Sequence, residues 1–440
     1  MYVWWTMVFL KLIHHPLLAG RLVSVTTGAL SAIGIYFLGT EIFHNKRVGI
    51  LSSLLYVLYP FALVYDKLAL YDSMVAMFTI WALYLEVLFV RKLRLDIALI
   101  LALVIGGGML TKTSAFFSLA LIPFALLLFD FSQKRLKERL ANFVLLSLVV
   151  VVLANLYYGV LRLSPFYHII GEKNDVFVYP LGQWVHHPFR FFFGNFHGLM
   201  SWLIGYASIP ILVLVAISFV VSFKYWREKL LLLAWFSAPF VFLALFGKVL
   251  YPRFILFMSM PLLVMAAFSF DALFQIVKKP AFTILIFIVF LSGFLIKDYF
   301  LLTNFAIAPI PASDKNQLLN DWPAGIGVKP SVAYFTKQAE TQHIFIATEG
   351  TFGLMPSAYE IFLEKNPNIS IKGIWPIDHT PPGWLLSKAR QMPTYMVFYQ
   401  PCNTCGLTGE APSTWNVTKV LQYPYYNPNR YFTVYKVNPK

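Results

Sequence analysis

The chain has 440 residues, of which 59% are hydrophobic and only 12% are charged, and its mean hydropathy is +0.68. A soluble domain carries about a quarter charged residues, so the composition excludes a wholly soluble protein and indicates a polytopic membrane protein. The net charge of +15 does not indicate nucleic-acid binding, because the basic residues gather in alternate connections between apolar segments.

The first 21 residues, "MYVWWTMVFLKLIHHPLLAGR", are aromatic and lack the basic start and small-residue cleavage pattern of a signal peptide. We expect an amphipathic segment that lies in the membrane interface. The alternative is a poorly formed first transmembrane helix.

Apolar stretches of about 20 residues can cross a bilayer, and they predict about ten transmembrane helices. The expected ranges are 20–40, 48–64, 73–90, 97–111, 113–130, 140–160, 203–223, 230–247, 254–276 and 281–298.

Alternate connections hold 14 of the 24 Lys and Arg residues before residue 300, in "HNKR", "RKLR", "QKRLKER", "KYWREK" and "KK". The positive-inside rule therefore orients the chain. Both ends, the loop with Asp66 and Asp72, and the loop 161–202 are expected on the outer side of a plasma or inner membrane.

From about residue 300 the composition becomes richer in Pro, Asn, Asp and Thr. Helices are predicted in "SVAYFTKQAE", "PSAYEIFLEKNP" and "WLLSKARQ", and strands in "HIFIAT", "TYMVFYQ", "VTKVLQY" and "YFTVYKV". We therefore predict a transmembrane domain over residues 1–299 and an extracytoplasmic α/β domain over residues 300–440.

Two side-chain groups outside the helices carry alternative interpretations. Cys402 and Cys405 predict a local disulfide in an oxidising compartment, since one pair cannot form a zinc site without other ligands. His186, His187 and His197 lie in an aromatic loop. Their spacing matches no metal motif, so interfacial anchoring is favoured and a divalent metal stays an alternative.

Ionisable residues near membrane depth are costly and are candidates for function. Asp66, Asp72, Lys112 and Arg253 all fall at expected outer helix ends. If the loop is helical, Asp66 and Asp72 lie about 9 Å and 120° apart, too far to share a proton. One should act in chemistry while the other caps or is solvated, and Asp72 could itself cap the following helix.

Lys112 and Arg253 are expected to converge on one anion, because Arg and Lys are the usual ligands of phosphate. We expect Asp72 to point into the same outer cavity.

The stretch "HPLLAGRLVSVTTGALSAIGIYFLGTEIFHNKRVGILSSLLYVLYPFALVYDKLALYDSMVAMF" resembles the front half of polyprenyl-phosphate-sugar-dependent glycosyltransferases with the GT-C fold. These include lipid A aminoarabinose transferases and protein O-mannosyltransferases. "GMLTKTSAFF" is similar to the family's Thr-Lys-Gly segment, with Thr113 at the Gly. "YPRFILFMSMPLL" is similar to its Arg-Tyr segment, with Phe254 at the Tyr.

The resemblance covers about residues 1–275 and implies a GT-C-like helical bundle. It also implies catalytic Asp72 and Asp66, donor phosphate binding by Lys112 and Arg253, and substrate contacts from Tyr251, His187 and Arg190. The family's catalytic carboxylate follows a first transmembrane helix, and Met1 falls inside the matching loop. We therefore expect an N-terminally short or degenerate member, whose own activity is in question.

The expected function is a hexosyl- or pentosyltransferase that moves a sugar from a polyprenyl-phosphate donor in the bilayer to a protein, lipid or glycan acceptor. No nucleotide is required. The alternatives are a secondary transporter, which should carry ionisable residues in mid-helix, and a non-catalytic scaffold that binds glycans.

Overall fold

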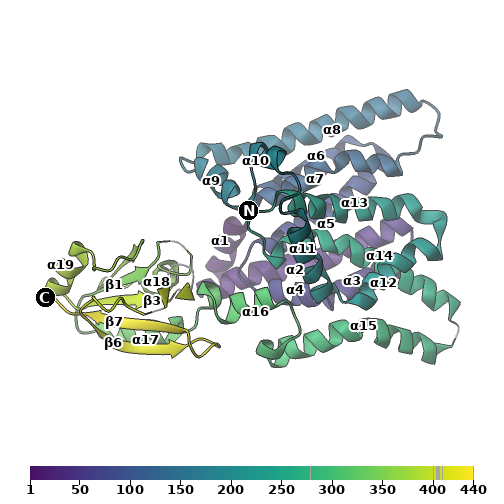
Figure 1. Cartoon of the computed structure of the whole chain (residues 1–440). Helices are drawn as coiled ribbons and strands as arrows, with labels where there is room; N and C mark the ends of the chain where they lie inside the picture. The colour runs from purple at the N-terminus through teal and green to yellow at the C-terminus, as the bar shows by residue number, and fades with distance from the viewer. Residues whose placement is uncertain (278, 352, 400, 403–406, 409, 440) are drawn as a thin grey trace. The chain divides into compact units, whose positions relative to one another are not determined.

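A computed structural model describes residues 1–277, 279–351, 353–399, 401–402, 407–408 and 410–439 (Figure 1). The chain forms two compact units, Met1–Pro311 and Ala312–Lys440. This division lies after Pro311, and the sequence predicted a boundary at about residue 300.

The first unit is helical throughout (Figure 1). Its α-helices are α1 (Tyr2–Leu12), α2 (Pro16–Phe43), α3 (Lys46–Val57), α4 (Pro60–Tyr65), α5 (Asp72–Lys92), α6 (Leu95–Met109), α7 (Phe116–Ala120), α8 (Leu136–Gly159), α9 (His168–Phe177), α10 (Leu181–His186), α11 (Phe192–Ala207), α12 (Ile209–Val221), α13 (Trp226–Phe246), α14 (Leu256–Ile276) and α15 (Pro280–Thr303). Short 3-10 helices η1 (Thr113–Ala115), η2 (Ile122–Leu128) and η5 (Pro252–Ile255) connect some of them.

Within the described residues, 6 helices are long and apolar enough to cross a membrane. They are Pro16–Phe43, Asp72–Lys92, Leu136–Leu163, Phe223–Phe246, Pro252–Ile276 and Ala281–Thr303. A seventh span is possible if α11 and α12, which meet at an angle of 98°, are counted together. The chain is thus a multi-pass membrane protein.

The predicted number of about ten spans is not confirmed, because several expected helices are short or broken. The stretch 48–64 divides into α3 and α4 just before Pro60, where proline disfavours continuation of the preceding helix. Helix α6 has only 15 residues, and the stretch 113–130 divides into η1, α7 and η2.

Helix α1 has 11 residues, or about 16 Å of length, which is too short to span a bilayer of about 30 Å. The N-terminal segment is therefore not the transmembrane helix of the alternative interpretation. The Tyr2 hydroxyl donates to the Gly20 carbonyl at 2.8 Å, and Met1, Tyr2, Trp5 and Phe9 pack against Val23, Met74 and Met77. An interfacial position of α1 stays a prediction.

Helix α14 is the centre of the bundle. Every residue from Leu256 to Asp271 is buried, as expected for a helix that is apolar on all sides. It packs against α3, α5, α12 and α13, so the segment η5 just before it is held on a rigid support.

Three consecutive glycines let α6 approach its neighbours closely. A Cβ atom at Gly107 would lie 2.8 Å from the ring of Phe78 in α5, and one at Gly106 would lie 2.9 Å from Tyr157 in α8. Because α6 follows α5 directly and packs against it, its C-terminal end reaches the N-terminal end of α5.

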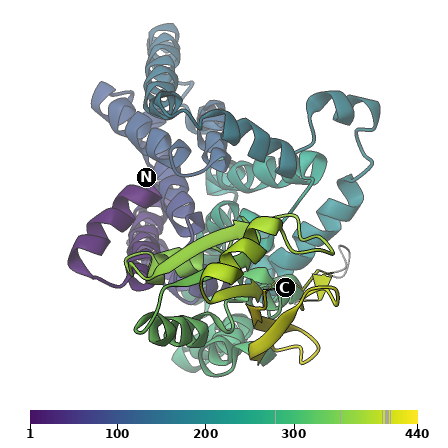
Figure 2. The ribbon, with the colours of Figure 1, turned by 90° about the vertical axis from the view of Figure 1, so that its left-hand side faces the viewer.

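The second unit is a five-stranded sheet in the order β2-β1-β3-β7-β6, coloured green to yellow in Figures 1 and 2. Strands β1 (Ile344–Glu349), β2 (Ile369–Ile374) and β3 (Thr394–Phe398) are parallel, while β6 (Val417–Pro424) and β7 (Tyr431–Val437) join antiparallel. The other elements are α16 (Ala312–Leu319), η7 (Trp322–Ala324), α17 (Val328–Ala339), α18 (Ser357–Leu363), α19 (Gly383–Gln391) and the hairpin β4 (Pro401–Cys402) and β5 (Leu407–Thr408). Separate apolar clusters on its two faces, one around Phe335 and one around Leu385, complete an α/β unit.

All four predicted strands and all three predicted helices of this unit are present. Strand β2 and helix α16 were not predicted. Cys405 lies outside the described residues, so the disulfide between Cys402 and Cys405 stays a prediction.

Candidate functional site

Asp72 is the first residue of α5 and only 4% exposed. Its Oδ1 accepts a hydrogen bond from Lys112 Nζ at 2.7 Å, and its Oδ2 lies 3.9 Å from Arg253 Nε. The N-cap of α5 is Tyr71, which makes no side-chain capping bond. The carboxylate is therefore engaged by two cations, and the structure gives no support to the alternative of Asp72 as a helix cap.

Lys112 directly follows the C-terminal turn of α6. Its backbone N–H donates to the Gly108 carbonyl at 3.0 Å, after which the chain becomes extended and leads into η1. Its Nζ lies 4.4 Å from the ring centroid of Phe254 and 5.2 Å from that of Tyr71. Burial lowers the pKa of Lys112, and the Asp72 carboxylate raises it part of the way back.

Arg253 lies in η5, immediately before the central helix α14. Its guanidinium carbon lies 4.2 Å from the ring centroid of Tyr251, a distance at which a cation is attracted to the ring face. Tyr251, predicted to contact substrate, thus packs against Arg253 and does not line either of the cavities described next.

Lys112 and Arg253 line one cavity of about 710 Å³. Its walls are mainly apolar and aromatic, with charge contributed by Lys112, Lys173, Asp175 and Arg253. The sequence-based expectation that the two cations meet at one cavity therefore agrees with this geometry. Asp72 does not line that cavity; it lies behind the cations, contrary to our expectation that it points into the cavity.

Asp66 has a different environment from Asp72. Its Oδ2 accepts a hydrogen bond from the Tyr56 hydroxyl at 2.9 Å, and a Cβ atom at Gly28 of α2 would clash with the same oxygen. Burial raises the pKa of Asp66 from its ordinary 3.8 to about 6, although hydrogen bonds from Ser73 and Tyr56 oppose this rise. Asp66 lines neither cavity, so its contacts are those of a packing residue.

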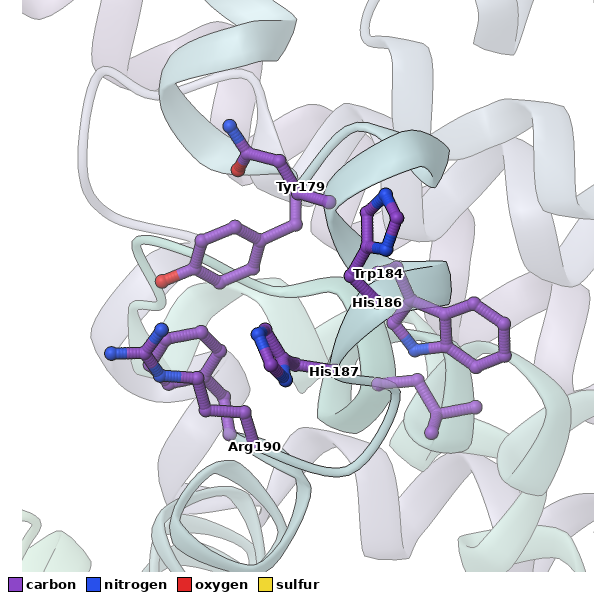
Figure 3. A pocket seen from close by; sticks show the side chains of 8 residues that line it. Tyr179, Trp184, His186, His187 and Arg190 are labelled. Carbon is purple, nitrogen blue, oxygen red and sulfur yellow. The ribbon is translucent and has the colours of Figure 1, made fainter.

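His187 and Arg190, also predicted to contact substrate, line a second cavity of about 430 Å³ (Figure 3). The other lining residues are Tyr179, Gln183, Trp184, His186, Phe191 and Leu245. Tyr179 lines both cavities. His197 lies in α11 and does not line this cavity, and no three His, Cys, Asp or Glu residues in the described part of the chain could together hold a metal ion.

Sequence reasoning missed Lys173, Asp175 and Tyr179, which line the cavity of Lys112 and Arg253. They lie in the loop 161–202, whose short helices α9 and α10 carry no long periodic pattern. The signal that could have found them is charge: Lys173 and Asp175 fall in "GEKNDVF", between two aromatic stretches.

Residues 1–158 match the family model of dolichyl-phosphate-mannose-protein mannosyltransferase. The chain is 29% identical over 273 residues to the undecaprenyl phosphate-alpha-4-amino-4-deoxy-L-arabinose arabinosyl transferase of Yersinia enterocolitica. That match covers 58% of this chain and 46% of the relative. The chain thus spans about half the length of the curated relatives that it matches.

The fold is similar to the crystal structures of ArnT from Cupriavidus metallidurans, in the apo state and bound to undecaprenyl phosphate. The TM-scores are 0.57 and 0.56, at 15% sequence identity, and the alignments cover 99% of this chain and 86% and 87% of those proteins. The chain therefore has the GT-C fold, as the sequence resemblance implied.

The first prediction concerns Asp72. Replacing it in Asp72→Asn leaves Lys112 and Arg253 facing each other without their shared carboxylate, so the free energy of unfolding should fall by about 3 kcal/mol. Chemical unfolding in detergent micelles measures this. The control is Asp96→Asn, which breaks an exposed ion pair with Arg94 and should change stability little. Equal effects of the two variants would contradict the role given to Asp72.

A second prediction follows from the raised pKa of Asp66. Because the folded state holds the Asp66 proton more tightly than the unfolded state, stability should fall as pH rises from about 4 to about 6. Asp66→Asn, which can still accept from Tyr56, should remove this loss and stabilise the protein by about 2 kcal/mol at pH 7. Thermal unfolding at several pH values tests this, and an unchanged pH profile in the variant would contradict it.

Proposed function

We propose that this GT-C fold chain is a membrane glycosyltransferase that transfers a sugar from a polyprenyl-phosphate donor to an acceptor. The observation that carries the proposal is the pairing of Lys112 and Arg253 on one largely apolar cavity, with Asp72 between them. The ArnT structure determined with undecaprenyl phosphate supports a ligand of this chemical class.

The cavity can accommodate both the prenyl chain and the phosphate of such a donor. Aromatic side chains such as Phe117, Phe242 and Phe257 line it together with the cations. The prenyl chain would lie along these apolar walls while its phosphate contacts Lys112 and Arg253. Arg provides a fork of donors and Lys a compact charge, and both are usual partners of phosphate.

In the transfer step, a nucleophile of the acceptor attacks the anomeric carbon of the sugar. The bond from that carbon to the phosphate oxygen breaks, and the polyprenyl phosphate leaves with the electron pair. The leaving phosphate gains negative charge, which Lys112 and Arg253 would stabilise. The leaving group therefore needs no proton.

The acceptor must lose a proton to a general base as it attacks. Asp175 is the carboxylate that lines the same cavity within the described residues, whereas Asp66 and Asp72 are held by Tyr56 and by the two cations. We therefore assign the base to Asp175 and a positioning role to Asp72.

Substitution of the cations tests this function. Lys112→Gln and Arg253→Gln should each lower the rate of undecaprenyl phosphate release from undecaprenyl-phosphate-linked sugars by about 100-fold or more. The measurement is turnover of a panel of such donors by the purified protein. Arg162→Gln, which removes an exposed arginine of the loop 161–202 that does not line the cavity, should retain normal turnover. Equal turnover by all three variants would contradict the assignment.

We also propose that the protein lies in the plasma or inner membrane with Ala312–Lys440 on its outer side, because the basic connections mark the inner side. A C-terminal alkaline phosphatase fusion in a bacterial host should be active, and a C-terminal green fluorescent protein fusion should be dark. The opposite pair of results would contradict this orientation.

A further inference from the structure

The cavity of His187 and Arg190 is positively charged and contains no carboxylate among the described residues that line it. Figure 3 shows Tyr179, His187 and Arg190 near one another, with His186 and Trp184 on the other side of the same group. Neither Lys112 nor Arg253 lines this cavity. It is thus a separate polar site beside the proposed donor cavity.

The guanidinium of Arg190 has no carboxylate within 4.0 Å in the part of the chain that the structure describes. Its carbon lies 5.2 Å from the ring centroid of Phe191. Phe191 in turn stacks on Tyr179, with centroids 4.6 Å apart and planes within 3°. A rigid aromatic pair therefore forms one wall, and the charge of Arg190 is left for an anion from outside the chain.

Two backbone hydrogen bonds attach the loop that forms this cavity to one end of the bundle. Tyr179 N donates to Phe246 O at 2.8 Å, and Lys248 N donates to Phe177 O at 2.8 Å, so the loop pairs with the end of α13. Figure 1 shows α9 and α10 at the end of the bundle where α8 finishes. Because the ends of membrane-spanning helices reach the headgroup region, we expect the cavity to lie at that level.

The surroundings of the cavity are unusually apolar for an exposed loop. Leu181 and Val185, one turn apart on α10, are 65% and 61% exposed, and Phe189 and Phe193 are 61% and 74% exposed. Apolar side chains beside cationic ones are the pattern of a segment that lies in the membrane interface.

We propose that this cavity binds the phosphate of an anionic phospholipid of the surrounding bilayer. Arg190 would hold the phosphate as a fork of donors, with His187 beside it. Leu181, Val185 and Phe189 would contact the acyl region. Because Tyr179 lines both cavities, a lipid bound here fixes a wall of the donor cavity as well. This inference does not depend on the proposed transferase activity.

Native mass spectrometry of the full chain with added phosphatidylglycerol or phosphatidylcholine tests the proposal. Phosphatidylglycerol should bind more tightly than phosphatidylcholine. Arg190→Gln should weaken phosphatidylglycerol binding about fivefold, the effect of one basic residue at an anionic surface, and His187→Gln provides a second variant. The matched control is Arg162→Gln, since Arg162 is exposed in the same loop, stacks near Tyr167 and does not line the cavity.

A second probe, undecaprenyl phosphate, distinguishes this lipid site from the proposed donor site. Lys112→Gln should lose undecaprenyl phosphate and keep phosphatidylglycerol, and Arg190→Gln should do the reverse, which would support two distinct sites. Equal phosphatidylglycerol binding by wild type, Arg190→Gln, His187→Gln and Arg162→Gln would overturn the proposal. Loss of phosphatidylglycerol in Lys112→Gln alone would also overturn it, because the anion would then belong to the donor cavity.

Discussion

The arrangement of the proposed donor cavity depends on one buried carboxylate between two cations. Asp72, Lys112 and Arg253 come from the start of α5, the end of α6 and the turn before α14. Without Asp72, two positive charges would face each other in a poorly hydrated place, at a cost of several kcal/mol. With it, the three groups carry one net positive charge. A phosphodiester that joins a sugar to a prenyl chain carries one negative charge, and the prenyl phosphate that leaves carries more negative charge. The net positive charge of the three groups therefore stabilises the leaving phosphate more than the bound donor.

The rest of the bundle serves to keep these three elements together. Gly106 and Gly107 remove the side chains that would keep α6 away from Tyr157 and Phe78. Helix α14 is buried along the whole stretch Leu256–Asp271, which gives Arg253 a fixed base. Small residues at helix contacts are the usual means of close packing in membranes, where lipid supplies no hydrophobic force between helices.

Many of the site residues and strands could be predicted from the sequence. The features that could not be predicted were missed for physical reasons. Charges that a bilayer disfavours identified Lys112, Arg253 and Asp72, and alternating apolar residues identified β1, β3, β6 and β7. Hydropathy could not show that the stretch 203–223 bends between α11 and α12 or that 48–64 breaks at Pro60, because a broken span has the same composition as a straight one. Strand β2 lies at the sheet edge, and its sequence ISIKGI alternates apolar and polar residues only as far as Lys372, so its pattern was short. Lys173, Asp175 and Tyr179 reach the cavity through an irregular loop, where no periodicity places a side chain.

Asp66 and Asp72 show how environment separates two identical residues in one loop. Asp72 begins a helix whose neighbours present two cations, so its negative charge is balanced by side chains from other elements. Asp66 ends α4 and meets the Tyr56 hydroxyl and the bare backbone at Gly28, where no cation contacts it among the described residues. Burial then raises the pKa of Asp66 towards neutrality. A buried carboxylate without a cation, such as Asp66, is most stable when it is protonated. The carboxylate of Asp72 balances the charges of Lys112 and Arg253 only while it is ionised. The loop between α4 and α5 thus places one acid for packing and the other for organising the cations of the cavity.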